Sequence, residues 1–371
     1  MKHLILICNL ENIDCGKLRT SSSGYELGFA KGMAPFVKKV SIVSPKAKEK
    51  FEEGNIVLYP CHSGDLMKNA APVADFAKNL IEKDDNTVIL FWGYNPVVIN
   101  SFCRLKSAST KVVSMIYDTH SGELSGKNFY KKLLINLFYG FGKKQVNRLD
   151  GVFLFKEKAA EHLNLKIRRS VILPTVDIEK AKPFVHSEKE GMTFLYGGTL
   201  CDYNGINELL AAFSEVDFEG NKLKIFGAGP LKNAVETAAE KDPRITYGGL
   251  VPNEELMKET EKADVLLNLR KVPSIVNDFA FPSKITEYMM TGKVVVSTDV
   301  SGSEDFKKAV YLLKNLEKEE IVSVINHICC HREEFSEKAE NALLYLKKHH
   351  DSKMIFEKAH KFMFEELFKN I

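Results

Sequence analysis

The feature that most constrains the fold is an alternation of short apolar runs with amphipathic segments, which occurs twice along the chain. In the first half, helical patterns such as Tyr25–Val37 and Phe129–Asn147 separate the apolar runs, which include Leu4–Cys8, Val40–Val43, Val88–Trp92, Lys111–Ile116 and Gly151–Phe155. Continuous Val, Ile and Leu runs that alternate with helices are typical of a parallel sheet covered on both faces. The pattern predicts a first α/β domain over residues 1–174.

A polar segment rich in Lys and Glu, residues 175–190, interrupts this pattern and carries Pro183. We interpret it as a linker. The alternation then restarts over residues 191–350, with runs that include Thr193–Gly197, Lys222–Phe226 and Lys293–Thr298. Since 371 residues exceed what one hydrophobic core usually serves, two Rossmann-like domains are predicted. Ligands of open α/β sheets bind at the carboxyl ends of the strands, so we expect the site in a cleft between the domains.

Composition excludes several classes of function. The net charge of +3 is nearly balanced and argues against nucleic-acid binding. The seven cysteines are scattered without a CxxC pair, which argues against a zinc knuckle or a disulfide framework and favours the cytoplasm. The apolar runs fall short of the ~20 residues that a membrane span needs, and the first residues lead directly into an expected strand. No Asp-x-Asp follows a strand and no His cluster has ligand spacing, so we predict no cofactor and no bound metal.

Residues 277–297 are the most informative stretch. A loop turns at Pro282 into a short helix that Gly292 ends, and a β-branched strand follows. The first amides of that helix, at Ser283 and Lys284, have no intrahelical acceptor and favour an anion. Glu287 lies on the same helical face as Lys284. Amides, one cation and one carboxylate suit a ligand with phosphates and hydroxyls, such as a nucleotide-sugar, although a solvated Lys and Glu is the simpler alternative.

Glycines follow three expected strands of the second half, in Gly197-Gly198-Thr199, Gly227-Ala228-Gly229-Pro230 and Gly248-Gly249. Glycine there lets the backbone approach a ligand or makes a tight turn, and a plain turn stays open for each one. A dinucleotide fingerprint is weak because Lys232 stands where its third glycine would fall.

Three further candidates follow strands or precede helices. Arg270 closes an expected strand and is placed for bidentate phosphate binding, the alternative being a surface ion pair with Asp278 or Glu304. His120 follows the strand that ends at Ile116 and could act as a general base or bind a sugar hydroxyl, or simply be solvated. The Ser21–Gly24 segment could be a second phosphate-approach loop ahead of a helix, or a simple N-cap serine.

Together these pieces resemble the family 4 retaining glycosyltransferases, whose GT-B architecture has two Rossmann-like domains around a donor cleft. The resemblance is strongest from Thr193 to Asp299 and includes a Phe-Pro-Ser-Lys-x-x-Glu-Tyr motif that is typical of polysaccharide-assembly transferases. It implies that residues about 351–371 form helices that cross back to the first domain.

The resemblance also implies roles. Glu287 would hold the donor ribose, Ser283 and Lys284 the donor phosphates, Gly24 would approach the diphosphate, and His120 would lie near the transferred sugar. The implied catalytic residues are His120, Lys284 and Arg270. The implied donor-binding residues are Gly24, Gly198, Thr199, Gly229, Arg270, Phe281, Ser283, Lys284 and Glu287.

The chain departs from the family pattern at three places. Phe279 stands where the first glutamate of the family's Glu-x7-Glu motif would be, with Asp278 as the nearest carboxylate. Thr199 and Leu200 occupy the region of a usual Arg, and Asn204 replaces a usual Lys. We expect Arg270 and Lys284 to substitute for the two missing phosphate cations.

The expected function is therefore sugar transfer from a nucleotide-diphosphate sugar, uridine-linked, to a glycan or polyprenyl-linked acceptor with retention, in capsular, exopolysaccharide or lipopolysaccharide assembly. A nucleotide-sugar epimerase and a non-catalytic nucleotide-sugar-binding subunit are the alternatives. The basic, aromatic stretch from Lys127 to Lys144 could rest on anionic lipid at the inner face of the plasma membrane, or be a helix packed on the core.

Overall fold

The computed structural model describes residues 1–10, 21–61, 64, 66–118, 128–185, 191–216 and 220–369. The chain divides into two compact units. Unit 1 comprises Met1–Leu173, Asp278–Ala280 and Ser352–Ile371, and unit 2 comprises Pro174–Asn277 and Phe281–Asp351. Each unit is built around its own sheet, so the predicted α/β class with two parallel-sheet domains is confirmed.

The sheet of unit 1 has eight strands in the described residues, in the order β3-β4-β2-β1-β5-β6-β7-β8. All neighbours are parallel except β3 and β4, which pair antiparallel at the edge. The strands are β1 (Lys2–Ile7), β2 (Lys39–Ser44), β3 (Phe51–Glu53), β4 (Ile56–Pro60), β5 (Asn86–Trp92), β6 (Thr110–Ile116), β7 (Gly151–Leu154) and β8 (Arg168–Val171).

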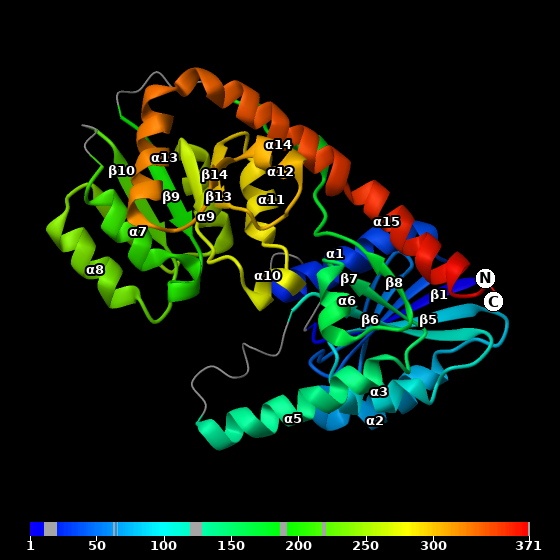
Figure 1. The fold of residues 1–371 in the computed structure, drawn as a ribbon. Coiled ribbons are helices and arrows are strands. Elements are labelled where there is room, and N and C mark those ends of the chain that lie inside the picture. Colours follow the sequence, from blue (N-terminus) through cyan, green and yellow to red (C-terminus); the bar gives the residue numbers. More distant parts are fainter. Residues whose placement is uncertain are drawn as a thin grey trace. The chain divides into compact units, whose positions relative to one another are not determined.

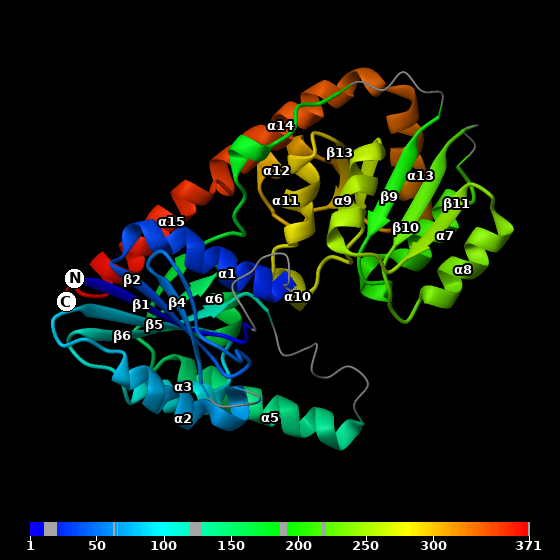
Figure 2. The same ribbon diagram turned by 180° about the vertical axis from the view of Figure 1, so that it is seen from behind.

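Helices cover both faces of this sheet (Figures 1 and 2). On one face lie α1 (Ser21–Met33) and α15 (Ser352–Lys361), whose Phe29 and Phe356 rings pack at 5.9 Å. The other face is covered by α2 (Leu66–Asn79), α3 (Pro96–Cys103), α5 (Phe129–Val146) and α6 (Lys158–Leu163). Both faces are apolar, which is why the strands are continuous hydrophobic runs rather than alternating ones.

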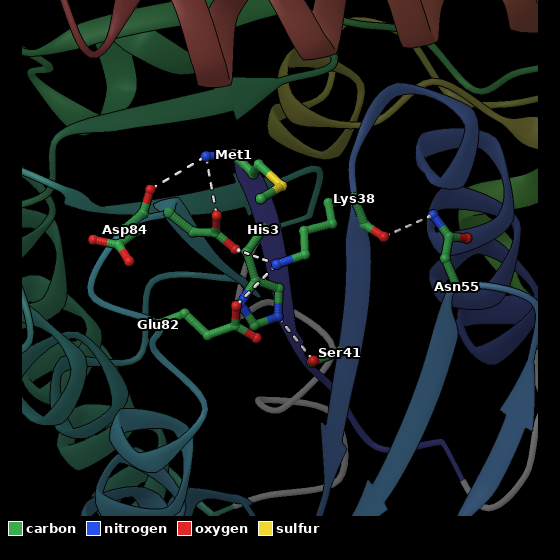
Figure 3. Close-up of polar contacts among 8 residues, drawn as sticks. Met1, His3, Lys38, Ser41, Asn55, Glu82 and Asp84 are labelled. Atoms are coloured by element: carbon green, nitrogen blue, oxygen red, sulfur yellow. Dashed lines mark hydrogen bonds and ion pairs between the residues drawn. The ribbon is translucent and has the colours of Figure 1, made fainter.

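A buried polar group sits at the amino end of β1, close to the chain's first residue (Figure 3). His3 is fully buried and its Nε2 lies 2.8 Å from Ser41 Oγ. Burial, assisted by the nearby Lys39, lowers the pKa of His3 to about 4. The same corner holds an ion pair between the terminal amine of Met1 and Asp85, at 3.0 Å.

The sheet of unit 2 is wholly parallel, with the order β11-β10-β9-β12-β13-β14 in the part of the chain that is described. Its strands are β9 (Thr193–Gly197), β10 (Lys222–Phe226), β11 (Ile245–Gly249), β12 (Val265–Asn268), β13 (Val294–Thr298) and β14 (Tyr311–Leu313). The order places the ends of β9, β10 and β12 side by side, and these strands carry the predicted site loops.

Helices also cover both faces of the second sheet. One face packs against α7 (Ile206–Phe213), α8 (Lys232–Lys241) and α13 (Lys318–Cys330). The other is covered by α9 (Asn253–Lys262), α11 (Ser283–Met290), α12 (Glu304–Ala309) and α14 (Phe335–His349) (Figures 1 and 2). A short helix, α10 (Ile275–Phe279), begins in unit 2 and ends in unit 1.

His350 is fully buried in unit 2 and contacts Pro174 and Phe281, which lie far from it in the sequence. Its Nδ1 donates to the Pro174 carbonyl over 2.7 Å, and its ring lies 4.9 Å from the ring of Phe281. Burial lowers the pKa of His350 to about 4. His3 and His350 therefore give each unit a buried, neutral imidazole.

Candidate functional site in unit 2

Two glycine loops pack backbone to backbone at the carboxyl ends of β9 and β10. The Gly198 amide donates to the Phe226 carbonyl and the Leu200 amide to the Ala228 carbonyl, each over 2.9 Å. A Cβ on Gly229 would lie 2.3 Å from the Leu200 carbonyl oxygen, and the φ of Gly229 is +158°. Glycine is therefore required at this position for the loops to meet, besides any approach to a ligand.

The first turn of α11 places Lys284 next to these two glycine loops. Pro282 caps the helix without a side-chain hydrogen bond, and Ser283 is exposed at its first position. The Lys284 Nζ lies 4.4 Å from the centre of the Tyr196 ring, and a Cβ on Gly198 would be only 2.4 Å from that nitrogen. The absence of a side chain at Gly198 thus leaves room for the ammonium group.

The surroundings of Lys284 disfavour its charged form. Burial among protein atoms lowers its pKa to about 7, and the positive charge of Arg270 adds to that effect. The carboxylate of Glu287 opposes it. Glu287 is exposed, and among the described residues it has no hydrogen-bond or ion-pair partner; crowding by the protein nevertheless raises its pKa. A bound anion would restore the charged form of the lysine.

Tyr288 connects α11 to the end of β9, and no role was predicted for it from the sequence. Its side chain is 2 % exposed, and its hydroxyl accepts from the Gly197 amide over 3.1 Å. Tyr288 lies four residues after Lys284, one turn along the same face of α11, so this contact positions the lysine. The spacing of four residues between Lys284 and Tyr288 is the sequence feature from which this role could have been predicted.

Arg270 follows β12 and is held by its backbone, because Thr298 Oγ1 donates to the Arg270 carbonyl over 2.7 Å. The guanidinium carbon lies 5.7 Å from the centre of the Tyr203 ring. Its Nε is buried without a hydrogen-bond partner. A buried donor left unpaired is unusual and is consistent with a ligand acceptor.

The alternative of a surface ion pair for Arg270 is wrong. Asp278 instead pairs with Lys158 and His162, each at 2.9 Å within unit 1, and Glu304 pairs with Lys307 at 2.7 Å. No described carboxylate pairs with Arg270. Phe279, which replaces the family's first glutamate, is buried in the core of unit 1.

The remaining predicted residues differ in their placement. Thr199 is exposed, and its carbonyl accepts from Tyr196 Oη and Asn204 Nδ2. Phe281 is 5 % exposed and packs on His350, so its side chain belongs to the packing of unit 2. The prediction of a loop at Gly24 is wrong: α1 begins at Ser21 and Gly24 lies inside that helix, exposed. His120 lies outside the described residues.

Unit 2 thus gathers Gly198, Gly229, Arg270, Lys284 and Glu287 around the carboxyl ends of its strands. Within the described part of the chain, no group of three His, Cys, Asp or Glu residues is arranged to hold a metal ion. Nor is any described helix long and apolar enough to cross a membrane.

Most of unit 2 is similar to a known protein family. Residues 191–330 match the family model described as Glycosyl transferases group 1. This segment is similar to glycosyltransferase group 1 domains. It contains every site residue named above for unit 2, from Gly198 to Glu287. A search of curated protein sequences gave no match.

Solved structures share the fold of the whole chain at low sequence identity. Sucrose-phosphate synthase from Thermosynechococcus elongatus has 13 % identity, a TM-score of 0.73 and 99 % coverage of both chains. The trehalose-6-phosphate synthase OtsA has 11 % identity and a TM-score of 0.76, over 98 % of this chain and 99 % of that one. Anabaena HepE, solved with UDP, has 15 % identity and a TM-score of 0.69, over 98 % and 99 %. These likenesses show the GT-B fold.

Proposed function

We propose that the chain is a retaining glycosyltransferase that transfers a hexose-type sugar from a nucleoside-diphosphate sugar, UDP-linked, to a glycan or polyprenyl-linked sugar. The observation that carries the proposal is the pair of cations at the strand ends of unit 2. The ammonium group of Lys284 lies next to Gly198, and its pKa is lowered. The nearby Arg270 has a buried Nε without a hydrogen-bond partner. A diphosphate supplies the acceptors and the negative charge that this pair lacks.

The proposed chemistry needs little covalent participation by the protein. The bond between the anomeric carbon and the diphosphate oxygen breaks as the acceptor hydroxyl forms a bond on the same face, and the hydroxyl proton passes to the leaving phosphate. Arg270, Lys284 and the first amides of α11 would stabilise the charge that develops on the diphosphate. Glu287 would accept hydrogen bonds from the ribose hydroxyls, and His120 would lie near the transferred sugar.

Two neighbours of the same fold support the donor class and the stereochemistry. One structure of HepE holds UDP and glucose, and a trehalose-6-phosphate synthase has been studied for glycosyl transfer with retention. For this chain we propose a donor without a bound metal or other cofactor, and a cytoplasmic location at the inner face of the plasma membrane. Assembly of capsular, exopolysaccharide or lipopolysaccharide chains is the proposed setting.

The test is a thermal-unfolding panel with UDP, GDP, ADP, their diphosphate sugars and pyrophosphate. A ligand at about 100 times its Kd should stabilise the protein by about 2.7 kcal/mol. We expect stabilisation by one base, and we expect Glu287→Gln to weaken binding of that nucleotide more than it changes binding of pyrophosphate, which lacks the ribose. Glu254→Gln is the matched control, since Glu254 is 84 % exposed in the same unit.

Other outcomes separate the alternatives. Stabilisation by no nucleotide would refute the donor site. Binding with no turnover over a panel of acceptors would favour a non-catalytic subunit. A new epimer of the donor sugar, formed without any acceptor, would identify an epimerase instead.

A further inference from the structure

Helix α5 of unit 1 carries a face of apolar side chains that are exposed in the part of the chain that the structure describes. Leu134 is 65 % and Leu137 62 % exposed, in a protein whose other apolar helix positions are mostly buried. Phe129 and Tyr130, at the start of the helix, are 73 % and 76 % exposed. In Figures 1 and 2 the first turns of α5 extend past α2 and α3, beyond the edge of the sheet of unit 1. Isolated exposed apolar residues need no explanation, but a contiguous face of them does.

The face that packs on unit 1 is a different one. Tyr139, Gly142 and Val146 are its buried residues, and Ile135 packs against the same core. A Cβ on Gly142 would lie 2.3 Å from the Tyr94 carbonyl oxygen, so the helix backbone approaches the start of α3 closely. With about 3.6 residues per turn, the stripe of Leu133, Leu137 and Phe141 points away from this packed face. The exposed apolar face is therefore not an edge of the core.

The charges on α5 are all of one sign. The helix contains Lys131, Lys132, Lys143 and Lys144 and no Asp or Glu. On a helical projection, Lys131 lies at one border of the exposed apolar face and Lys132 and Lys143 lie at the other, while Lys144 lies within the face at the last turn of the helix. This is the pattern of a helix that lies in a membrane interface, where lysine stems run along the apolar boundary and their ammonium groups reach the headgroups.

We propose that the outward face of α5 docks unit 1 on an anionic lipid bilayer. Charge decides between the candidate occupants. A second copy in a two-fold dimer would meet this face by the same face, and that would oppose lysine to lysine without a carboxylate on either helix. Anionic headgroups complement the lysines while Phe129, Tyr130, Leu134 and Leu137 enter the acyl boundary.

Sedimentation of the full chain with vesicles tests this proposal. Vesicles of phosphatidylcholine alone are compared with vesicles that also contain phosphatidylglycerol, at low and at high salt and without nucleotide. We expect binding to the anionic vesicles that high salt weakens. Lys131→Gln with Lys132→Gln should weaken it by about fivefold per lysine, and Leu134→Ser with Leu137→Ser by about tenfold per leucine.

Matched controls separate docking from a change in folding. Leu250 is 78 % exposed in unit 2 and Lys83 is exposed in unit 1, so Leu250→Ser and Lys83→Gln should bind vesicles as the wild type does. All variants should keep the wild-type unfolding midpoint, because the changed side chains are exposed.

Several results would overturn the proposal: no sedimentation with anionic vesicles, equal sedimentation of the α5 variants, or binding that is indifferent to lipid charge. A concentration-dependent dimer of the wild type that Leu134→Ser with Leu137→Ser abolishes would assign the face to self-association. The readout involves no nucleotide, so its failure would leave the donor proposal untouched.

Discussion

The two units have parallel sheets of the same kind, but the described residues at the carboxyl ends of their strands carry different chemistry. In unit 2 those ends hold glycine loops, Arg270 and Lys284. In unit 1, Tyr117 and Phe155 follow β6 and β7, and Tyr25 of α1 packs on them, with ring centroids 5.3 to 5.8 Å apart. The neighbouring Glu26 is buried, which raises its pKa to about 7. The sheet provides a common frame, and the residues just after the strands determine what each unit can bind.

The largest expected effect is on the affinity of unit 2 for phosphate groups and follows from replacing Lys284. Lys284→Met should weaken binding of both UDP and pyrophosphate by about 2–5 kcal/mol, because a desolvated charge contact to phosphate is lost. The unliganded protein should not lose stability, since the burial and the charge of Arg270 already disfavour the ammonium form. Titration calorimetry and urea unfolding measure the two quantities.

The control for Lys284→Met is Lys258→Met, at a residue that is 66 % exposed on α9 of the same unit. A pH series adds a second check. The free lysine has a pKa of about 7, so phosphate binding must bring a proton above that pH, and the affinity should fall by up to about tenfold per pH unit between pH 7 and the pKa of the bound form. Lys284→Met should show no such fall. Equal affinity of wild type and variant would remove Lys284 from the donor site.

The two buried histidines allow the units to be compared in acid. His3 in unit 1 and His350 in unit 2 both have a pKa lowered to about 4, against 6.5 for an ordinary histidine. The unfolded chain therefore binds protons first, and the stability of each unit should fall as the pH drops from 6.5 towards 4, by about 3 kcal/mol per histidine.

His3→Gln and His350→Gln should each flatten this acid dependence in its own unit. The measurement is urea unfolding at pH 7 and pH 5, followed by a fluorescence probe in each unit. His3→Gln should leave the pH dependence of unit 2 as it is in wild type. Unchanged acid dependence in both variants would show that other groups control acid unfolding.

The smallest expected effect contrasts two glycines that were both predicted to bind the donor. Gly24 lies in helix α1 with open space where a Cβ would be, so Gly24→Ala should stabilise the protein by about 0.5–1 kcal/mol. Gly229→Ala should destabilise it by about 1–3 kcal/mol, because φ is +158° and the Cβ would meet the Leu200 carbonyl. Urea unfolding distinguishes the two signs, and destabilisation by Gly24→Ala would mean that the helix does not continue through that residue.

The sequence predicted unit 2 better than unit 1 for identifiable reasons. Strands such as β9 (Thr193–Gly197) and β10 (Lys222–Phe226) are apolar runs with glycine directly after them, so their ends were readable. Helix α2 is harder to predict because Pro72 stands inside it, and Pro normally marks a helix boundary. The edge strand β3 was missed too, because it has only three residues and two of them are exposed.

The candidate site was only partly predictable. The positions of Lys284 and Glu287 on one helical face follow from local spacing. That no described carboxylate pairs with Arg270 does not, because it depends on which partners Asp278 finds, and these lie on α6, more than a hundred residues earlier in the chain. The contact of Tyr288 with Gly197 is non-local as well.

The passage of α10 from one unit to the other limits how the protein can be recombined. The chain changes unit at four points, and Asp278–Ala280 is a three-residue insertion of unit 1 within the sequence of unit 2. Phe279 is 1 % exposed in the core of unit 1, and its ring stacks on His162. A chimera joined only within residues 175–190 would take Phe279 and the C-terminal helices of unit 1 from one parent and the rest of unit 1 from the other. Exchange of donor specificity between such chains therefore requires grafting 174–277 and 281–351 while the host keeps its own Asp278–Ala280.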